Sequence, residues 1–229
     1  LGHTPFAHIG EDHLKACMEP YGGFEHNDQS LRVLTTLERK YPEWNGLNLT
    51  WETLEGVVKH NGPMTDKPHI AVRELQEKMD LRLDTYASME AQVAALSDDI
   101  AYNNHDVEDG LRAGLFTIAD LEEVDLLKEA LTRVREKYAD LEKRYLVQEM
   151  IREMIGTMVQ DVLAESRARL AALNPQSAED VRMVGKPMVA FSEEMRIKVD
   201  DLRTFLFDRM YRHYTIIRIW GKVERIITD

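Results

Sequence analysis

Cysteine is almost absent from this sequence: Cys17 is the only one among 229 residues, so no disulfide can form within the chain. We expect Cys17 to be a buried, inert thiol and the protein to work in a reducing compartment, the cytoplasm. The sequence also lacks any apolar run near the ~20 residues that cross a bilayer as a helix, and no signal-peptide pattern opens it. We therefore expect neither a disulfide-stabilised secreted domain nor a helical membrane protein.

Positive charge is scarce as well. Lys and Arg number 29 against 41 Asp and Glu, which gives a formal net charge of -12. An acidic chain is a poor general binder of the DNA backbone, because phosphates attract cations. Hydrophobic residues make up 44% of the chain and charged residues 31%, a balance that excludes a disordered chain and predicts a sizeable core.

Alternating strand patterns are rare, whereas apolar residues recur at the helical spacings of three and four. One such stripe consists of Leu121, Val124, Leu127 and Leu131. We predict an all-α chain, with a short strand pair between residues 181 and 191 as the one exception. The chemistry-bearing motifs lie in residues 1–114, and residues 115–229 form a plainer helical portion that we expect to pack on the same domain.

Histidines gather near the start of the chain, where His3, His8 and His13 surround Glu11. On a helix, His8 and Glu11 share a face because they are three residues apart. A carboxylate beside an imidazole raises the pKa of the imidazole and fixes its tautomer, which prepares it for acid–base work near neutral pH. The alternative is an ordinary pair on a helix surface.

A second polar cluster, residues 24–30, stands at a predicted helix start for which Asn27 is a candidate cap. Free backbone N–H groups at such a start favour an anion, for example a phosphate. The alternative is an ordinary capping cluster without a ligand.

A third cluster places Asp98, Tyr102 and Asp106 at intervals of four residues, along one helix face. The apolar lead-in over residues 89–96 predicts that this helix is buried. Buried carboxylates are costly unless they are paired or bind a metal, so the face is a candidate site for a hard cation. The alternative is a solvated acidic face.

Five motifs, in order along nearly the whole chain, resemble the dGTPase family of HD-domain deoxynucleoside triphosphate triphosphohydrolases, and in particular its bacterial dGTPase-like proteins. They are Leu1–Glu11, similar to the stretch that follows the family's His-Asp doublet, Phe24–Ser30, Lys59–Pro63, Asp98–Arg112 and Phe205–His213. Each motif is modest alone, and their shared order carries the resemblance.

The resemblance implies an all-helical HD fold, with residues 1–114 as part of the catalytic core. It also implies a reaction in which water attacks the α-phosphorus of a dNTP and releases the deoxynucleoside and intact triphosphate, with Mg²⁺ or Mn²⁺ as the metal. The family's metal ligands are a His, the His-Asp doublet and a later Asp, and only the last has a match here, Asp98. We therefore expect the chain to begin inside a longer protein, without the N-terminal helices that carry the first ligands.

The resemblance further implies roles for single residues. His8 matches the catalytic His that acts as general acid to the leaving 5′ oxygen, and Glu11 matches the carboxylate that orients it. His26 matches another catalytic His near the phosphates. The positions implied for substrate binding are His3, Tyr102 and Asp106.

Two other functions stay open from the sequence. One is a different HD-type phosphohydrolase, such as a phosphodiesterase or a nucleotidase. The other is a non-catalytic nucleotide-binding or assembly protein. Its support is that three of the four family metal ligands have no match in this sequence.

The expected partners are a dNTP substrate and further copies of the chain, because the family commonly forms oligomers, often hexamers. The resemblance also allows an activating dNTP and single-stranded DNA, and we expect no membrane partner. Arg209 and Arg212 lie in a locally basic C-terminal stretch and can share a helix face. They either pair with acidic segments or bind the phosphates of such a ligand.

Overall fold

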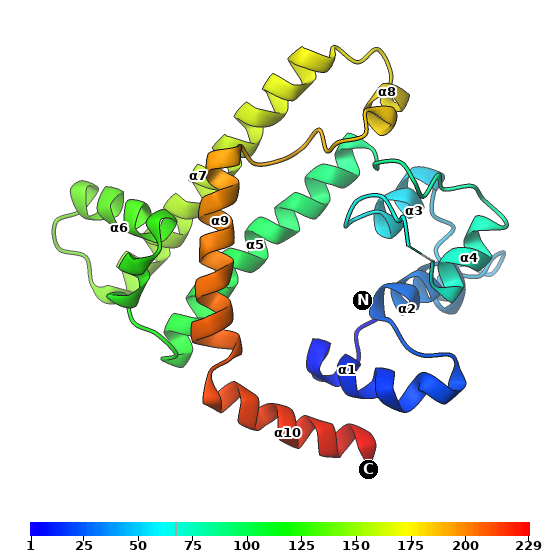
Figure 1. Ribbon diagram of the computed structural model, residues 1–229, viewed down its shortest axis with the longest axis horizontal. Helices are drawn as coiled ribbons and strands as arrows, with labels where there is room; N and C mark the ends of the chain where they lie inside the picture. The colour runs from blue at the N-terminus through cyan, green and yellow to red at the C-terminus, as the bar shows by residue number, and fades with distance from the viewer. Residues whose placement is uncertain (67) are drawn as a thin grey trace. The chain divides into compact units, whose positions relative to one another are not determined.

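The computed structural model describes residues 1–66 and 68–229 and confirms the prediction of an all-α chain (Figure 1). Among these residues there is no strand, and one isolated β-bridge joins Arg39 to Gly46. The strand pair expected between residues 181 and 191 is wrong. Ser177 and Asp180 form a reciprocal capping box there, which starts the helix α8 (Ala178–Met183) instead.

The described chain divides into two compact units that interleave along the sequence. Unit 1 consists of Leu1–Gln92, Gln176–Pro187 and Arg218–Asp229, and unit 2 of Val93–Pro175 and Met188–Ile217. The chain therefore passes between the units four times. Each unit is described by itself.

Unit 1 is built from short helices. They are α1 (Ala7–Met18), the 3₁₀ turn η1 (Glu19–Tyr21), α2 (His26–Arg32), the π-helical turn η2 (Val33–Leu37), α3 (Trp51–Val58), α4 (Ile70–Gln76) and α8. Its apolar core consists of Leu31, Leu54, Val58, Ala71, Val72 and Leu81. After α3, Gly62 adopts the left-handed backbone (φ +96°) that a glycine takes without strain, and Pro63 follows it.

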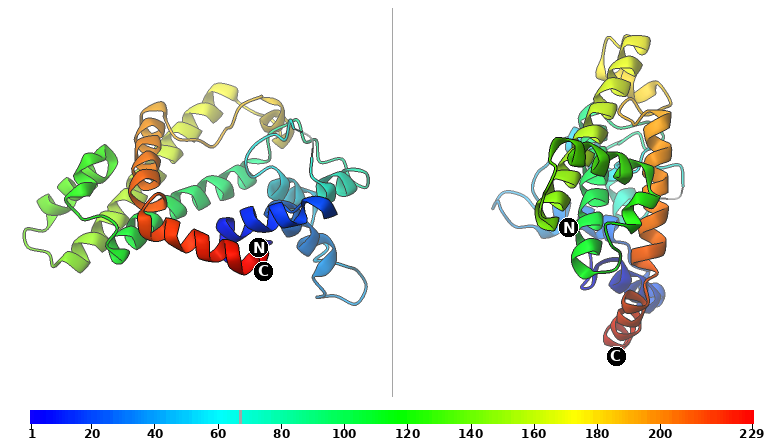
Figure 2. Two further views of the ribbon diagram at one scale, coloured as in Figure 1. Left: turned by 60° about the horizontal axis from the view of Figure 1, so that its bottom comes forward. Right: turned by 90° about the vertical axis from the view of Figure 1, so that its left-hand side faces the viewer.

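Unit 2 is built mainly from long helices. They are α5 (Met89–Ala113), whose first turn belongs to unit 1, η3 (Asp120–Glu123), α6 (Asp125–Lys137), α7 (Lys143–Leu173), α9 (Glu193–Leu206) and the π-helical turn η4 (Phe207–Tyr211). The last helix, α10 (Tyr214–Thr228), begins in unit 2 and belongs to unit 1 from Arg218 onward. Figure 2 shows α6 lying alongside α7. The predicted stripe Leu121, Val124, Leu127 and Leu131 is buried in this core, beside Met150, Met154 and Met158 of α7.

The structure bears on two expectations, one about membrane-spanning helices and one about the burial of Cys17. No helix in the described part of the chain is both long and apolar enough to cross a membrane. The expectation that Cys17 is buried is wrong: it lies exposed on α1, because the buried residues of that helix are Gly10 and Glu11.

Candidate active site

The first residues of the chain fold back against α2. The hydroxyl of Ser30 on α2 donates a hydrogen bond to the carbonyl oxygen of Leu1 at 2.6 Å. Gly2 has a φ of +75°, and a Cβ there would stand 2.3 Å from the carbonyl oxygen of His26. A glycine is therefore required at this close approach, which brings His3 onto α2.

Glu11 is the centre of the polar cluster, with only 8% of its surface exposed. Its carboxylate accepts a hydrogen bond from the backbone N–H of His26 at 2.8 Å and lies 2.9 Å from Nδ1 of the same residue. Nδ1 of His8 lies 3.3 Å from the other side of the carboxylate. The structure thus confirms the predicted His8–Glu11 pair and adds His26, fifteen residues further along the chain.

These contacts set the protonation of the cluster. Burial raises the pKa of Glu11, but the donors from His26 and His8 outweigh it, and the net pKa is lowered. Because the Nδ1 atoms of His8 and His26 face the Glu11 carboxylate, each Nδ1–H donates to it, and each Nε2 is left to contact a ligand. The arrangement orients two imidazoles with one carboxylate.

His3 completes the cluster by ring contacts. Its ring centroid lies 4.2 Å from that of His26 and 4.9 Å from that of His8. Burial lowers the pKa of His3, and the neighbouring imidazoles lower it further, so His3 stays neutral at pH 7. Three histidines from two of the predicted motifs, Leu1–Glu11 and Phe24–Ser30, are therefore brought together around Glu11.

The cluster also has the donor set of a metal site. His3, His8, Glu11 and His26 each offer one ligand atom, and these atoms lie within 4.8 Å of one another. Three imidazole nitrogens suit an ion such as Zn²⁺ or Fe²⁺ better than Mg²⁺ or Mn²⁺, which prefer oxygen ligands. Glu11 already accepts hydrogen bonds from two histidines, which fits a carboxylate that orients imidazoles rather than the main ligand.

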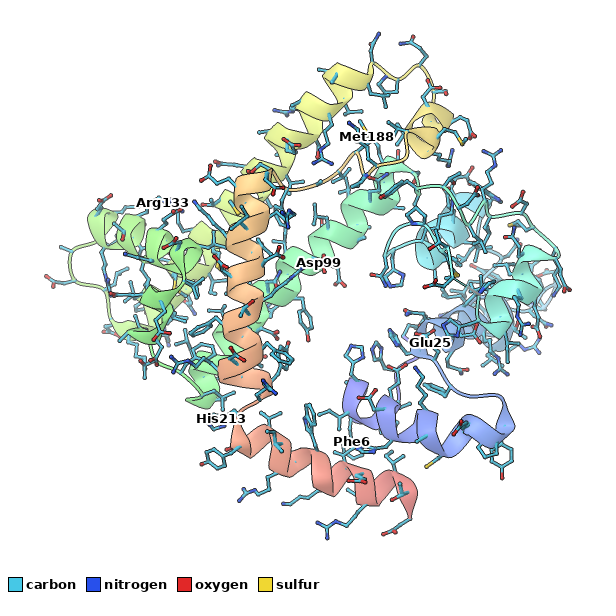
Figure 3. All side chains as sticks on the ribbon, viewed as in Figure 1. Phe6, Glu25, Asp99, Arg133, Met188 and His213 are labelled. Carbon is cyan, nitrogen blue, oxygen red and sulfur yellow. The ribbon has the colours of Figure 1, made fainter. Side chains whose placement is uncertain are left out.

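The start of α2 is capped by a side chain of the same chain. The cap is Glu25, not Asn27: its carboxylate accepts hydrogen bonds from the backbone N–H of Asp28 at 2.7 Å and from the side-chain amide of Asn27 at 2.8 Å. The carboxylate also lies 3.3 Å from Nδ1 of His26 (Figure 3 labels Glu25). Of the two alternatives left open by the sequence, the Glu25 carboxylate supports capping, because it accepts from a backbone N–H group that could otherwise bind an anion.

In unit 2, Tyr102 and Asp106 on α5 are joined by a residue that sequence reasoning missed. The hydroxyl of Tyr211 lies 2.7 Å from that of Tyr102 and donates a hydrogen bond to the carboxylate of Asp106. Burial raises the pKa of Asp106 although the Tyr211 hydroxyl acts in the opposite direction. Tyr211 lies in the motif Phe205–His213, which signalled the resemblance without pointing to a role.

The predicted burial of the acidic face of α5 is wrong for Asp98 and Tyr102, which are exposed, whereas Asp106 is partly buried. Asp98 and Asp99 are exposed, and the buried face of α5 consists of Ile100, Asn103, Asn104, Val107 and Gly110. Asp99, labelled in Figure 3, lies 3.2 Å from the guanidinium of Arg203, whereas the carboxylate of Asp98 has no ion pair among the described residues. Asp98 is therefore free to take an external ligand.

The C-terminal arginines Arg209 and Arg212 both contact side chains of the same chain. The guanidinium of Arg209 pairs with Glu123 at 2.9 Å, and that of Arg212 lies 5.4 Å from the ring centroid of Phe207. For Arg209, the structure shows the alternative of pairing with an acidic segment.

Residues 189–229 match the family model of the phosphohydrolase-associated domain. This match and the helical structure are consistent with an all-α HD-domain fold.

Curated relatives match most or all of the chain. Over the whole chain, 53% of residues are identical to a "deoxyguanosinetriphosphate triphosphohydrolase-like protein" of Parvibaculum lavamentivorans and 52% to one of a Caulobacter species. A protein of the same name from Paracoccus denitrificans is 50% identical over 95% of the chain. The chain spans 57–59% of the length of these relatives. Over its whole length the chain is therefore similar to deoxyguanosinetriphosphate triphosphohydrolase-like proteins.

Proposed function

We propose that the protein hydrolyses deoxynucleoside triphosphates to the deoxynucleoside and triphosphate. The observation that carries the proposal is the cluster in which one buried carboxylate, Glu11, orients His8 and His26. The names of the relatives, which are 50% or more identical, support the substrate class.

His8 is the proposed general acid. Its side chain is 65% exposed, so it is accessible to a ligand while its Nδ1 is held by Glu11. The proton that leaves is then the one on Nε2, which is transferred to the 5′ oxygen as the bond between that oxygen and the α-phosphorus breaks. Glu11 fixes the ring direction and stabilises the imidazolium before the transfer.

The other histidines have supporting roles in this proposal. His26 is only 20% exposed at its side chain and is held by both Glu11 and Glu25, so its Nε2 has a fixed direction toward a bound phosphate. His3, kept neutral by its surroundings, adds a hydrogen-bonding group without adding positive charge. Tyr102 and Asp106 are proposed to contact the sugar and phosphates.

A divalent ion is part of the proposal, as the family resemblance implies. Asp98 would hold it, and its carboxylate, which is exposed and has no ion pair with any residue that the structure describes, fits that role. When bound, Mg²⁺ or Mn²⁺ supplies Lewis-acid stabilisation of the phosphoryl oxygens.

The test is an assay of the complete protein with each dNTP, with and without divalent metal, in which the products are separated by ion-exchange chromatography. The proposal predicts equal amounts of deoxynucleoside and triphosphate. Release of orthophosphate or pyrophosphate instead would indicate a different HD-type phosphohydrolase, and binding without turnover would indicate a non-catalytic protein.

A further inference from the structure

The helix α8 is attached to unit 1 although its sequence neighbours belong to unit 2. The chain leaves unit 2 after Pro175, forms α8 within residues 176–187, and re-enters unit 2 at Met188. Residues 176–187 are called the α8 strap below. Two of the four passages between the units lie at its ends.

The strap is anchored by few buried side chains. Of its twelve residues, only Val181 and Arg182 are buried, and Met183 next to them is 63% exposed. The backbone carbonyl of Arg182 accepts a hydrogen bond from the N–H of Tyr86, and Glu179 pairs with Arg82 at the surface. So small a buried area indicates attachment that opens locally without unfolding the rest of unit 1.

Arg182 makes the strongest of these attachments. Its guanidinium donates to both oxygens of the Glu55 carboxylate on α3, at 2.9 to 3.2 Å. It also lies 5.0 Å from the ring centroid of Trp51. Glu55 is fully buried and accepts a further hydrogen bond from Lys59 at 3.1 Å.

The charges of this cluster are unequal. Two cations, Arg182 and Lys59, share the single carboxylate of Glu55, so the buried group carries one excess positive charge. Without Arg182, the pair of Glu55 and Lys59 is neutral and keeps its hydrogen bonds, including the one from Lys59 to Thr85 at 2.9 Å. When the strap is away from α3, Lys59 still neutralises Glu55, and water can reach the carboxylate oxygen Oε2, to which Arg182 donates in the attached state.

Both ends of the strap have the backbone of a turn. Asn174, which caps α7, has a φ of +48°, and Gly185 has a φ of +72°. A proline follows each of them within two residues, at Pro175 and Pro187. Asn174 ends α7, and Gly185 and Pro187 lie in the segment between α8 and α9, so neither flanking helix continues into α8.

From this anchoring we propose that the α8 strap is a releasable latch: it detaches from α3 as one piece when the Arg182–Glu55 ion pair breaks, and unit 1 stays folded. Release removes the constraint of unit 1 on the chain between α7 and α9. The latch is a conformational device beyond the proposed hydrolysis and does not depend on it.

Thiol labelling in the complete protein tests the latch. Val181→Cys in a Cys17→Ser background puts one thiol at the buried contact of the strap, where a disulfide reagent reacts only after release. Adding Arg182→Met is expected to speed labelling about tenfold or more, with little change in the unfolding temperature. The matched control is Glu179→Gln, which removes the exposed ion pair of the same strap and should change labelling less than twofold.

Hydrogen exchange of the same proteins without the cysteine substitutions gives an independent measurement. With Arg182→Met, exchange should rise in residues 178–183 and stay unchanged in α3. An unchanged labelling rate would overturn the proposal. So would faster exchange throughout unit 1 or a matching fall in unfolding temperature, because the cluster would then be part of the fold rather than a latch.

Discussion

Glu11 is the residue on which the geometry of the candidate active site depends. One carboxylate holds His8 at 3.3 Å and His26 at 2.9 Å, and both imidazoles are thereby fixed in direction. The spacing of three residues predicted the contact with His8. It could not predict His26, because the fold of Leu1–Pro5 and the turn before α2 bring residues fifteen positions apart together; only the family resemblance indicated His26.

At this scale, the first prediction concerns His8. His8→Ala should lower kcat by about 10²–10⁴-fold, the usual contribution of a positioned proton donor, and change KM much less. Triphosphate release by the complete protein is the measurement. His13→Ala is the matched control, since His13 lies on the same helix outside the cluster; equal losses in both variants would remove His8 from the mechanism.

The second prediction concerns Glu11 and acid stability. The pKa of Glu11 is lowered in the folded state, so its stabilisation is present above its ordinary value of 4.5 and is lost as the pH falls through the folded-state pKa. Glu11→Gln should cost about 1–3 kcal/mol of unfolding free energy at pH 7, and the difference from the natural protein should shrink by pH 3. Urea unfolding at both pH values measures it. A difference that stays constant with pH would show that the charge of Glu11 is not what matters.

At the scale of the element, helix α5 carries two kinds of residue on different faces. Its periodicity predicted a helix, and the register of Asp98, Tyr102 and Asp106 along one face needs only the helical repeat. Burial of that face could not be predicted, because packing of α5 into the unit 2 core decides it. Ile100 and Val107 enter that core, whereas Val93 in the apolar lead-in stays 49% exposed.

The third prediction separates two adjacent carboxylates of α5. Asp98→Asn should abolish metal binding and activity together, because Asp98 is the one ligand that the resemblance identifies. Asp99→Asn should keep both and lose at most about 1 kcal/mol, since its ion pair with Arg203 is exposed. Metal content by elemental analysis and activity are measured for both. Normal metal content in Asp98→Asn would show that this assignment is wrong.

The fourth prediction concerns Tyr211, which joins Tyr102 to Asp106. Tyr211→Phe removes one hydroxyl and should lower kcat/KM about 2- to 10-fold, the effect of a single hydrogen bond. Because that hydrogen bond lowers the pKa of Asp106 against its burial, the variant should also shift the acid limb of the pH profile upward. Tyr214→Phe, at an exposed tyrosine nearby in the sequence, is the control. An unchanged pH profile in Tyr211→Phe would contradict the link to Asp106.

At the scale of the whole molecule, the sequence predicted the all-α class and a family resemblance. It did not predict that the two units interleave along the chain. Apolar spacing reports on neighbours three or four residues apart. The contact between Glu55 and Arg182 joins residues 127 positions apart, and nothing in the local pattern of either segment signals it. The same holds for Tyr211 and Asp106, which are 105 positions apart.

The central claim is that water attacks the α-phosphorus of a dNTP while the bond to the 5′ oxygen breaks. The most direct measurement is hydrolysis by the complete protein in water enriched in oxygen-18, followed by mass spectrometry of both products. One labelled oxygen in the triphosphate and none in the deoxynucleoside is the predicted result, because the water oxygen then bonds to the α-phosphorus. Label in the deoxynucleoside, or release of a labelled nucleoside monophosphate, would contradict the account.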